Sequence, residues 1–249
     1  MSSLNITRSG AGPRLLFLHG IDGTESCAAA AAALAENHEV ILPDHPGFGH
    51  SDSADEIASV SDLAYFYLDL MDELNLNGVD LVGHCLGGWI AAELAIRNTS
   101  RIRSLTLVAS AGLRVDGIPM GDPFLWSPEE NVRQSLIDAH MITTRLAEPL
   151  TETAVEIALK NQQAAARYTW SPRLHNPALR NWLHRIDVPT LIIWGDQDRI
   201  FPPAYAHAFE TFVPQTEVTI FKDCGHLPML EKQEAFVKRL DRFLDDLAQ

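Results

Sequence analysis

Apolar residues form short continuous runs along the chain, and most runs end in a turn rich in glycine or polar residues. Runs that are apolar throughout, rather than alternating with polar residues, are expected for strands buried on both faces of a parallel sheet. A weaker strand is expected at residues 4–8. The runs predicted as strands are RLLFLHG (14–20), EVILP (39–43), GVDLVGH (78–84), IRSLTLVASAG (102–112), PTLIIWGD (189–196) and EVTIFKD (217–223).

Segments with helical spacing separate most of these strands. ESCAAAAAALAEN (25–37) is rich in alanine, the strongest helix former. SVSDLAYFYLDLMDELNL (59–76) has apolar residues at helical spacing, with Ser61 expected as its N-cap. LGGWIAAELAIRN (86–98) and LEKQEAFVKRLDRFLDDL (230–247) are further helices. This alternation predicts an α/β fold, a mostly parallel sheet flanked by helices.

The alternation stops at residues 113–185, which contain no clear strand. Prolines at 119, 123, 128, 149, 172 and 177 break this stretch into short helical pieces. We expect a helical lid, 113–185, inserted into a core formed by residues 1–112 and 186–249. Trp126, Met141 and Trp170 are candidates for the substrate pocket and indicate an apolar or aromatic substrate, although packing within the lid explains many of its large side chains equally well.

Composition narrows the class of partner. The 249 residues carry a formal net charge of −14, which argues against binding to nucleic acid or to an anionic membrane, because both require a basic face. The three cysteines, Cys27, Cys85 and Cys224, follow no disulfide or zinc spacing. No signal sequence and no long apolar segment is evident, so a cytoplasmic protein with free thiols is expected.

The stretch GHCLG (83–87) places Cys85 between a predicted strand and a predicted helix. A side chain at such a turn projects above the sheet edge, at the positive end of the helix, where a thiolate is favoured. The glycines permit a tight turn, and the backbone N–H of Leu86 faces the atom under attack. Cys85 is therefore a candidate nucleophile. A buried small hydrophobic residue and a cysteine standing in place of a natural serine are the alternatives, and the strand–turn–helix context disfavours the first.

A base and an acid follow later strands. His226 lies in a turn directly after the strand at 217–223, and Asp198 lies after the strand at 189–196. An acid that binds an imidazole holds it in one tautomer and stabilises its charged form. Asp196, in the same turn as Asp198, is expected to cap the backbone instead. Nucleophile, acid and base thus follow successive strands in the α/β-hydrolase order.

The turn LHGIDG (18–23) supplies Ile21, whose backbone N–H is a candidate second donor to an oxyanion. Asp22 beside it is a candidate contact for a polar substrate group, although such an aspartate more often closes the turn. We find no set of metal ligands at suitable spacing and no G-x-G-x-x-G fingerprint, so no cofactor is expected.

LFLHG, DHPGFGHSD, LVGHCLGG, PTLIIWGDQDRIFP and GHLPMLE together resemble the α/β-hydrolase superfamily, in the small lidded branch of esterases, lactonases and carbon–carbon bond hydrolases. The resemblance implies that Cys85 is the nucleophile, His226 the base and Asp198 the acid, with Ile21 and Leu86 as oxyanion donors. The chain departs from the family in two ways. The short N-terminal region implies that the usual first antiparallel hairpin is reduced or absent, and most relatives have serine at the position of Cys85.

The resemblance implies hydrolysis of a carboxylic ester, lactone or related acyl substrate through an acyl-enzyme. A carbon–carbon bond hydrolase of a diketone-like substrate, an acyltransferase and a cofactor-free lyase are alternatives on the same fold. A non-catalytic ligand receptor is less expected, because a binding protein needs no complete set of nucleophile, acid and base.

Overall fold

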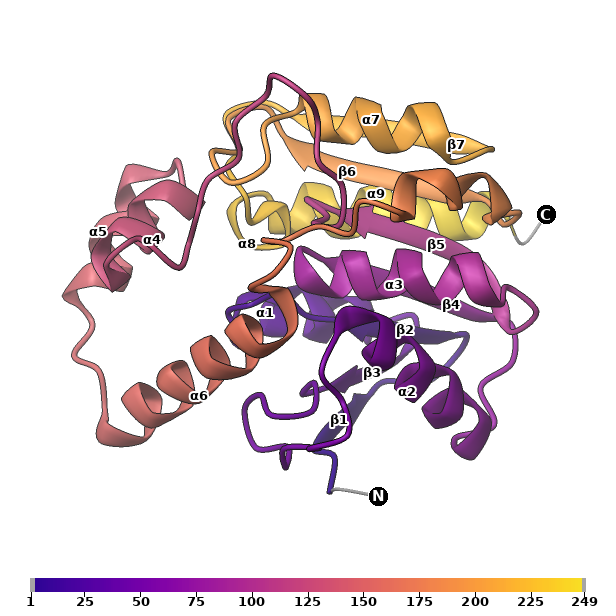
Figure 1. Cartoon of the computed structure of the whole chain (residues 1–249), viewed down its shortest axis with the longest axis horizontal. Coiled ribbons are helices and arrows are strands. Elements are labelled where there is room, and N and C mark those ends of the chain that lie inside the picture. The colour runs from indigo at the N-terminus through magenta and orange to yellow at the C-terminus, as the bar shows by residue number, and fades with distance from the viewer. Residues whose placement is uncertain (1–2, 248–249) are drawn as a thin grey trace.

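The structure is a computed structural model that describes residues 3–247. Within these residues, seven strands form a single sheet in the order β1-β3-β2-β4-β5-β6-β7 (Figure 1). All neighbouring pairs are parallel except β1 with β3. The strands are β1 (Ile6–Ser9), β2 (Arg14–Leu18), β3 (Glu39–Pro43), β4 (Val79–His84), β5 (Ile102–Val108), β6 (Thr190–Gly195) and β7 (Thr216–Phe221).

Helices cover both faces of the sheet, as the unbroken apolar strands predict. On β2, Leu16 and Leu18 pack into one core cluster, and Leu15 and Phe17 pack into the other on the opposite face. α2 (Val60–Glu73), α3 (Leu86–Arg97) and α7 (Ala204–Phe212) cover the first face, and α1 (Glu25–Leu34) and α9 (Gln233–Asp246) cover the second (Figure 1). The predicted α/β-hydrolase architecture is confirmed.

The N-terminal edge of the sheet is a lone antiparallel strand. β1 pairs with β3, with Ile6 opposite Pro43 and Ser9 opposite Val40. β1 forms no antiparallel hairpin with the next strand along the chain, because β2 pairs in parallel with β3 and β4. At this edge the sheet therefore has one antiparallel strand and no β1–β2 hairpin.

Several element boundaries differ from the predictions. Ser59, not Ser61, is the N-cap of α2, because Ser59 is extended and its side chain accepts a hydrogen bond from the Asp62 N–H at 3.1 Å. The last predicted helix is two helices, α8 (Pro228–Glu231) and α9, separated by Lys232 in a non-helical conformation. α7 was not predicted from the sequence.

The segment between β5 and β6 (109–189, the inserted segment) contains α4 (Pro128–Ser135), α5 (Ala139–Ala147), α6 (Glu152–Thr169) and the short 3₁₀ turns η1 (Leu179–Asn181) and η2 (Leu183–Arg185). α4, α5 and the start of α6 project beyond the end of the sheet (Figure 1). The return of the segment belongs to the main body, since Leu179, Leu183 and Ile186 are fully buried in the core.

α6 is fastened to the core by polar contacts with the loop after β3. The Lys160 ammonium donates to the carbonyl oxygens of Gly49 and Ser51 at 2.9 and 2.7 Å. The Asn161 side chain accepts from the Gly49 N–H at 2.8 Å, and the Tyr168 hydroxyl donates to the Pro46 carbonyl at 3.0 Å.

In the described residues, no helix combines the length and apolarity that a membrane crossing requires.

Candidate active site

Cys85 occupies a strained turn between β4 and α3. Its backbone has φ 50° and ψ −112°, a conformation that residues other than glycine rarely adopt. Three hydrogen bonds impose it: the Cys85 N–H donates to Val108 at 3.0 Å, and its carbonyl accepts from Trp89 and Ala111 at 3.1 and 3.0 Å. Strain held by surrounding structure in this way is characteristic of functional positions. The thiol consequently lies at the N-terminus of α3, at the carboxyl edge of the central strands.

Two glycines allow the strand–turn–helix that carries Cys85 (the elbow) to pack against its neighbours. A Cβ atom on Gly87 would overlap the Leu18 carbonyl oxygen of β2, and one on Gly83 would overlap the Gly87 carbonyl oxygen. Because β2 and β4 are paired, with Leu18 opposite Gly83, the loop after β2 lies directly beside the elbow. The turn that contains Ile21 is thereby placed next to Cys85.

His226 and Asp198 form a buried pair on the loops after β7 and β6. The His226 Nδ1–H donates to Asp198 Oδ2 at 2.8 Å. The other carboxylate oxygen accepts from the backbone N–H groups of Ile200 and Phe201 at 2.8 and 2.9 Å. With 4% of Asp198 and 1% of His226 exposed, the carboxylate is fixed in position and the imidazole is held in one tautomer.

The electrostatic surroundings of His226 favour its charged form. Burial alone lowers the pKa of His226, but the neighbouring Asp198 carboxylate raises that pKa well above its usual value. The ring of His84, the residue directly before Cys85, lies 4.9 Å from the His226 ring, which places the imidazole beside Cys85. His226 Nε2 is buried and has no hydrogen-bond partner within residues 3–247, so it is available to a nucleophile or a substrate.

The backbone of His226 is held from two further directions. The His84 Nε2–H donates to the His226 carbonyl at 3.1 Å, and burial followed by the charge of His226 lowers the pKa of His84 well below normal, so this ring is neutral. The His226 N–H donates to the Ser135 carbonyl at 2.8 Å, at the end of α4. The sequence gave no signal for the contact with Ser135.

Glu231 ties the loop of His226 to the inserted segment. One carboxylate oxygen accepts from the backbone N–H groups of Ile137 and Asp138 at 2.6 and 2.9 Å. The other accepts from the Gly225 N–H at 2.6 Å. In the motif GHLPMLE, the only sequence signal for this role is an acidic residue five positions after His226.

Two backbone N–H groups beside Cys85 have no acceptor within residues 3–247, namely those of Ile21 and Leu86. The Gly20 carbonyl, in the same peptide unit as the Ile21 N–H, accepts from His19 Nδ1–H at 2.7 Å and from the Gly23 N–H at 3.2 Å. Burial lowers the pKa of His19 to about 4, so the ring is neutral and keeps this proton. The direction of the Ile21 N–H is therefore fixed before any ligand binds, as an oxyanion donor requires.

A cavity of about 790 Å³ lies between the carboxyl edge of the sheet and helices α4–α6. It reaches the site through Ile21 and Leu227, the neighbours of the elbow and of the base. Cys85 and His226, each 1% exposed, are not themselves among the lining residues. The wall formed by the inserted segment is largely apolar and includes Phe124, Trp126, Leu136, Leu146, Leu150, Ile157 and Ala165.

Of the three side chains predicted for the substrate pocket, Trp126 lines this cavity and the other two lie elsewhere. Met141 packs against the core cluster on the α1 and α9 side of the sheet. Trp170 caps α6, is 54% exposed, and has its ring 3.9 Å from the Arg173 guanidinium. Helical pattern alone did not reveal which side of each inserted helix faces the cavity.

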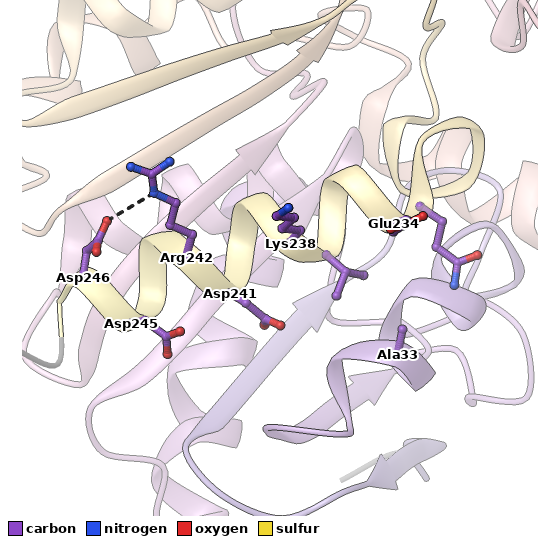
Figure 2. A pocket seen from close by; sticks show the side chains of 9 residues that line it. Ala33, Glu234, Lys238, Asp241, Arg242, Asp245 and Asp246 are labelled. Atoms are coloured by element: carbon purple, nitrogen blue, oxygen red, sulfur yellow. Dashed lines mark ion pairs between the residues drawn. The ribbon is translucent and has the colours of Figure 1, made fainter.

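A second hollow runs along α9 and α1, on the face of the sheet opposite α3 (Figure 2). Its lining is mainly charged, with Arg242 paired to Asp246 at 3.9 Å, and includes no cysteine, serine or histidine. Within residues 3–247 no group of three or more histidine, cysteine, aspartate or glutamate side chains is arranged to hold a metal ion.

Comparison with known proteins agrees with this geometry. The sequence is 28% identical over 258 residues to 2-hydroxymuconate semialdehyde hydrolase of Pseudomonas sp. strain CF600, covering 96% of this chain and 89% of that protein. It is 28% identical over 233 residues to Lipase 1 of Psychrobacter immobilis, covering 89% and 73%. The structure of an enol-lactonase from Burkholderia xenovorans LB400 has the same fold, with a TM-score of 0.79 at 22% identity over 98% of this chain and 97% of that one. The sequence model of the alpha/beta hydrolase fold matches residues 13–233, and the chain belongs to this family.

Proposed function

We propose that this protein hydrolyses a carboxylic ester, lactone or related acyl substrate through a thioester on Cys85. One observation carries the proposal. The buried His226–Asp198 pair, with its unpartnered Nε2, lies beside a cysteine elbow that has two free backbone donors. An enzyme of acyl transfer needs these parts together: a nucleophile, a base with an orienting acid, and an oxyanion site.

The mechanism follows from these positions. The Cys85 thiolate attacks the substrate carbonyl carbon, and the oxygen that gains the negative charge binds the N–H groups of Ile21 and Leu86. The His226 imidazolium donates its Nε2 proton to the leaving alkoxide, which departs as the alcohol and leaves a thioester. Neutral His226 then takes a proton from water, and the hydroxide attacks the thioester. Collapse of the tetrahedral intermediate releases the acid and restores the thiolate and the imidazolium.

The cavity supports a substrate that is mainly apolar or aromatic, because the inserted segment contributes mostly apolar side chains to its wall. We propose that α4–α6 act as a lid over this substrate and that the enzyme works in the cytoplasm without a cofactor. A second candidate reaction is carbon–carbon bond hydrolysis, which is favoured by the likeness to a 2-hydroxymuconate semialdehyde hydrolase. Acyl transfer, cofactor-free lyase chemistry and ligand reception without catalysis are outcomes that the experiment distinguishes.

The test is acylation of Cys85 by 4-nitrophenyl acetate and 4-nitrophenyl butanoate. A burst of nitrophenol and an acyl adduct in the intact mass are expected for the wild type and absent for Cys85→Ala. Cys27→Ala is the matched control, because Cys27 is also buried and free and burial raises the pKa of its thiol to about 12. The control is expected to keep both the burst and the adduct, with the adduct mapped to the peptide that contains Cys85.

The Cys85→Ser variant tests whether the elbow is built for an oxyester intermediate. Faster turnover of this variant, with a slow second step in the wild type, would indicate a site designed for serine. Equal rates of acylation and deacylation in the wild type would indicate a site adapted to cysteine. Turnover without an adduct and unaffected by Cys85→Ala would overturn the acyl-enzyme and favour a lyase, and ligand binding with neither turnover nor adduct would favour a receptor.

A further inference from the structure

Asp22 is a carboxylate beside the proposed reaction centre without a structural task. It follows Ile21 and lines the cavity. The sequence offered turn closure as the simpler role, but the Gly23 N–H closes this turn by donating to the Gly20 carbonyl at 3.2 Å. Within residues 3–247 the Asp22 side chain takes part in no hydrogen bond or ion pair; its backbone carbonyl alone is bound, by Asn161. The side chain is therefore free to contact a ligand.

The backbone that carries Asp22 is nonetheless held firmly. The Asn161 side chain, from α6, donates to the Asp22 carbonyl at 3.2 Å and accepts from the Gly49 N–H at 2.8 Å. A Cβ atom on Gly23 would collide with this amide, so the loop and α6 are closely fitted. Asp22 thus presents a carboxylate at a fixed place near the carbonyl group that Ile21 is proposed to bind.

The side chains that line the cavity carry a net negative charge. Among the lining residues that the structure describes, Arg145 is the one cation, and it pairs with Glu25 at 3.3 Å across the gap between α5 and α1. Carboxylates outnumber it, and several are engaged: Asp44 accepts from the Thr24 hydroxyl at 3.1 Å, and Glu129 pairs with Arg133 at 2.8 Å. A substrate carboxylate would therefore meet an excess of carboxylates along the cavity wall, and the nearest other positive charge, that of His226, belongs to the reaction centre itself.

We infer that Asp22 is a specificity-determining residue that binds a cationic or hydrogen-bond-donating group of the substrate, a few bonds from the scissile carbonyl, and that the cavity rejects substrates bearing a carboxylate there. This rests on the proposed function, because Ile21 locates the carbonyl. A hydrogen bond between such a donor and a carboxylate is charge-assisted, and it is roughly twice as strong as one between neutral groups. The remainder of the substrate contacts the apolar wall.

The test compares pairs of esters with the same shape and different charge. On the acyl side, methyl 3-(dimethylamino)propanoate, protonated at neutral pH, is paired with methyl 4-methylpentanoate. On the alcohol side, 2-(dimethylamino)ethyl butanoate is paired with 3-methylbutyl butanoate. Monomethyl succinate is the anionic member. Acid release is followed for the wild type, Asp22→Asn and the matched control Glu148→Gln, which removes a charge from another part of the same cavity wall.

In at least one pair, Asp22→Asn is expected to reduce the ratio of kcat/KM for the cationic ester to that for its neutral isostere by about ten- to a hundred-fold, the range of a charge-assisted hydrogen bond. Intrinsic ester reactivity cancels in this comparison. Glu148→Gln is expected to change the ratio less than threefold, and monomethyl succinate to be the poorest wild-type substrate.

Two failures are distinguishable. If the neutral esters acylate Cys85 while the ratio is unchanged by Asp22→Asn in both pairs, the role of Asp22 is overturned and the proposed function stands. Equal effects of the two variants would also overturn it, because they would indicate a general charge effect rather than a contact. If no ester of either pair acylates Cys85 and 4-nitrophenyl esters also fail to do so, the proposed function itself fails.

Discussion

Asp198→Asn removes the charge of the buried acid while preserving its shape. The asparagine oxygen can still accept from the N–H groups of Ile200 and Phe201, which lie 2.8 and 2.9 Å from Oδ1. Its NH₂ group then replaces Oδ2, which now accepts from His226 Nδ1 at 2.8 Å. Because that NH₂ group is a donor, the ring must accept at Nδ1 and carry its proton on Nε2. This is the wrong tautomer for a base that takes a proton at Nε2.

The size of the effect follows from the lost hydrogen bond and the wrong tautomer. A hydrogen bond to a charged partner contributes about 1.5–3 kcal/mol, and each 1.36 kcal/mol is roughly tenfold in rate. In a serine enzyme of the trypsin type the same exchange costs roughly 10⁴ in kcat. A thiol, with an ordinary pKa of about 8.5, depends less on its base than a serine hydroxyl does. We therefore expect kcat/KM to fall by about 10² to 10³.

The assay is the pH dependence of kcat/KM for 4-nitrophenyl butanoate. Burial opposes the charge on His226 and Asp198 restores it, so the loss of this carboxylate lowers the pKa of His226. If the active form is a thiolate paired with an imidazolium, the alkaline limb of the profile must move to lower pH. Thermal unfolding monitors the fold, which the two retained backbone hydrogen bonds are expected to preserve.

Asp196→Asn is the control, since Asp196 lies in the same loop and only accepts from the Cys224 N–H at 3.3 Å. It is expected to stay within about twofold of the wild type. A loss below fivefold for Asp198→Asn, together with an unmoved alkaline limb, would refute the reasoning. The imidazolium would then not depend on Asp198, and the site would not work as a triad.

Two further predictions concern stability. Gly87→Ala forces a Cβ atom into the backbone of β2 and is expected to lower the free energy of unfolding by about 3 kcal/mol or more. Gly78→Ala meets no atom but keeps a positive φ, so it should cost about 1 kcal/mol. Urea unfolding of both variants measures the difference, and equal losses of stability would contradict it. Asp80→Ala removes a buried carboxylate that binds Arg103 at 2.6 and 2.9 Å and should lower the free energy of unfolding by about 3 kcal/mol. Glu129→Ala, which breaks an exposed pair with Arg133, should cost less than about 1 kcal/mol. Comparable urea midpoints for the two variants would show that the buried pair adds nothing to stability.

The fold and the placement of Cys85, Asp198 and His226 at one edge of the sheet could be predicted because both depend on local signals. Buried parallel strands require apolar side chains on both faces, so each strand in the body of the sheet leaves a continuous apolar run. The loops that follow such strands meet at one edge, which is why Cys85, Asp198 and His226 could be assigned together from their positions after successive strands. β7, with a largely half-buried pattern, was still recognisable from its β-branched and aromatic residues.

The orientation of the helices in the inserted segment could not be predicted in the same way, because their apolar side chains face different surroundings, namely the cavity, the core and the molecular surface. Trp126, Met141 and Trp170 are similar in hydrophobicity, yet they contact the cavity, the core below α1 and a guanidinium at the surface, respectively. The N-cap of α2 shows the same limit on a smaller scale. Ser59 and Ser61 are both suitable caps by residue type, and only the extended backbone of Ser59 decides between them.

The base shows most clearly why local signals are insufficient for a site. His226 is held at its ring by Asp198, at its carbonyl by His84 and at its N–H by Ser135, from three segments that are remote in the sequence. The hydrogen bonds with Asp198 and His84 come from the edge of the sheet, which the fold fixes. The hydrogen bond with Ser135 comes from the inserted segment. Glu231 makes a second connection between that segment and the loop of His226, since it accepts from the Ile137 and Gly225 N–H groups. The position of the base therefore depends on the segment that also encloses the cavity, and the inserted helices contribute to the geometry of the reactive groups as well as to the shape of the pocket.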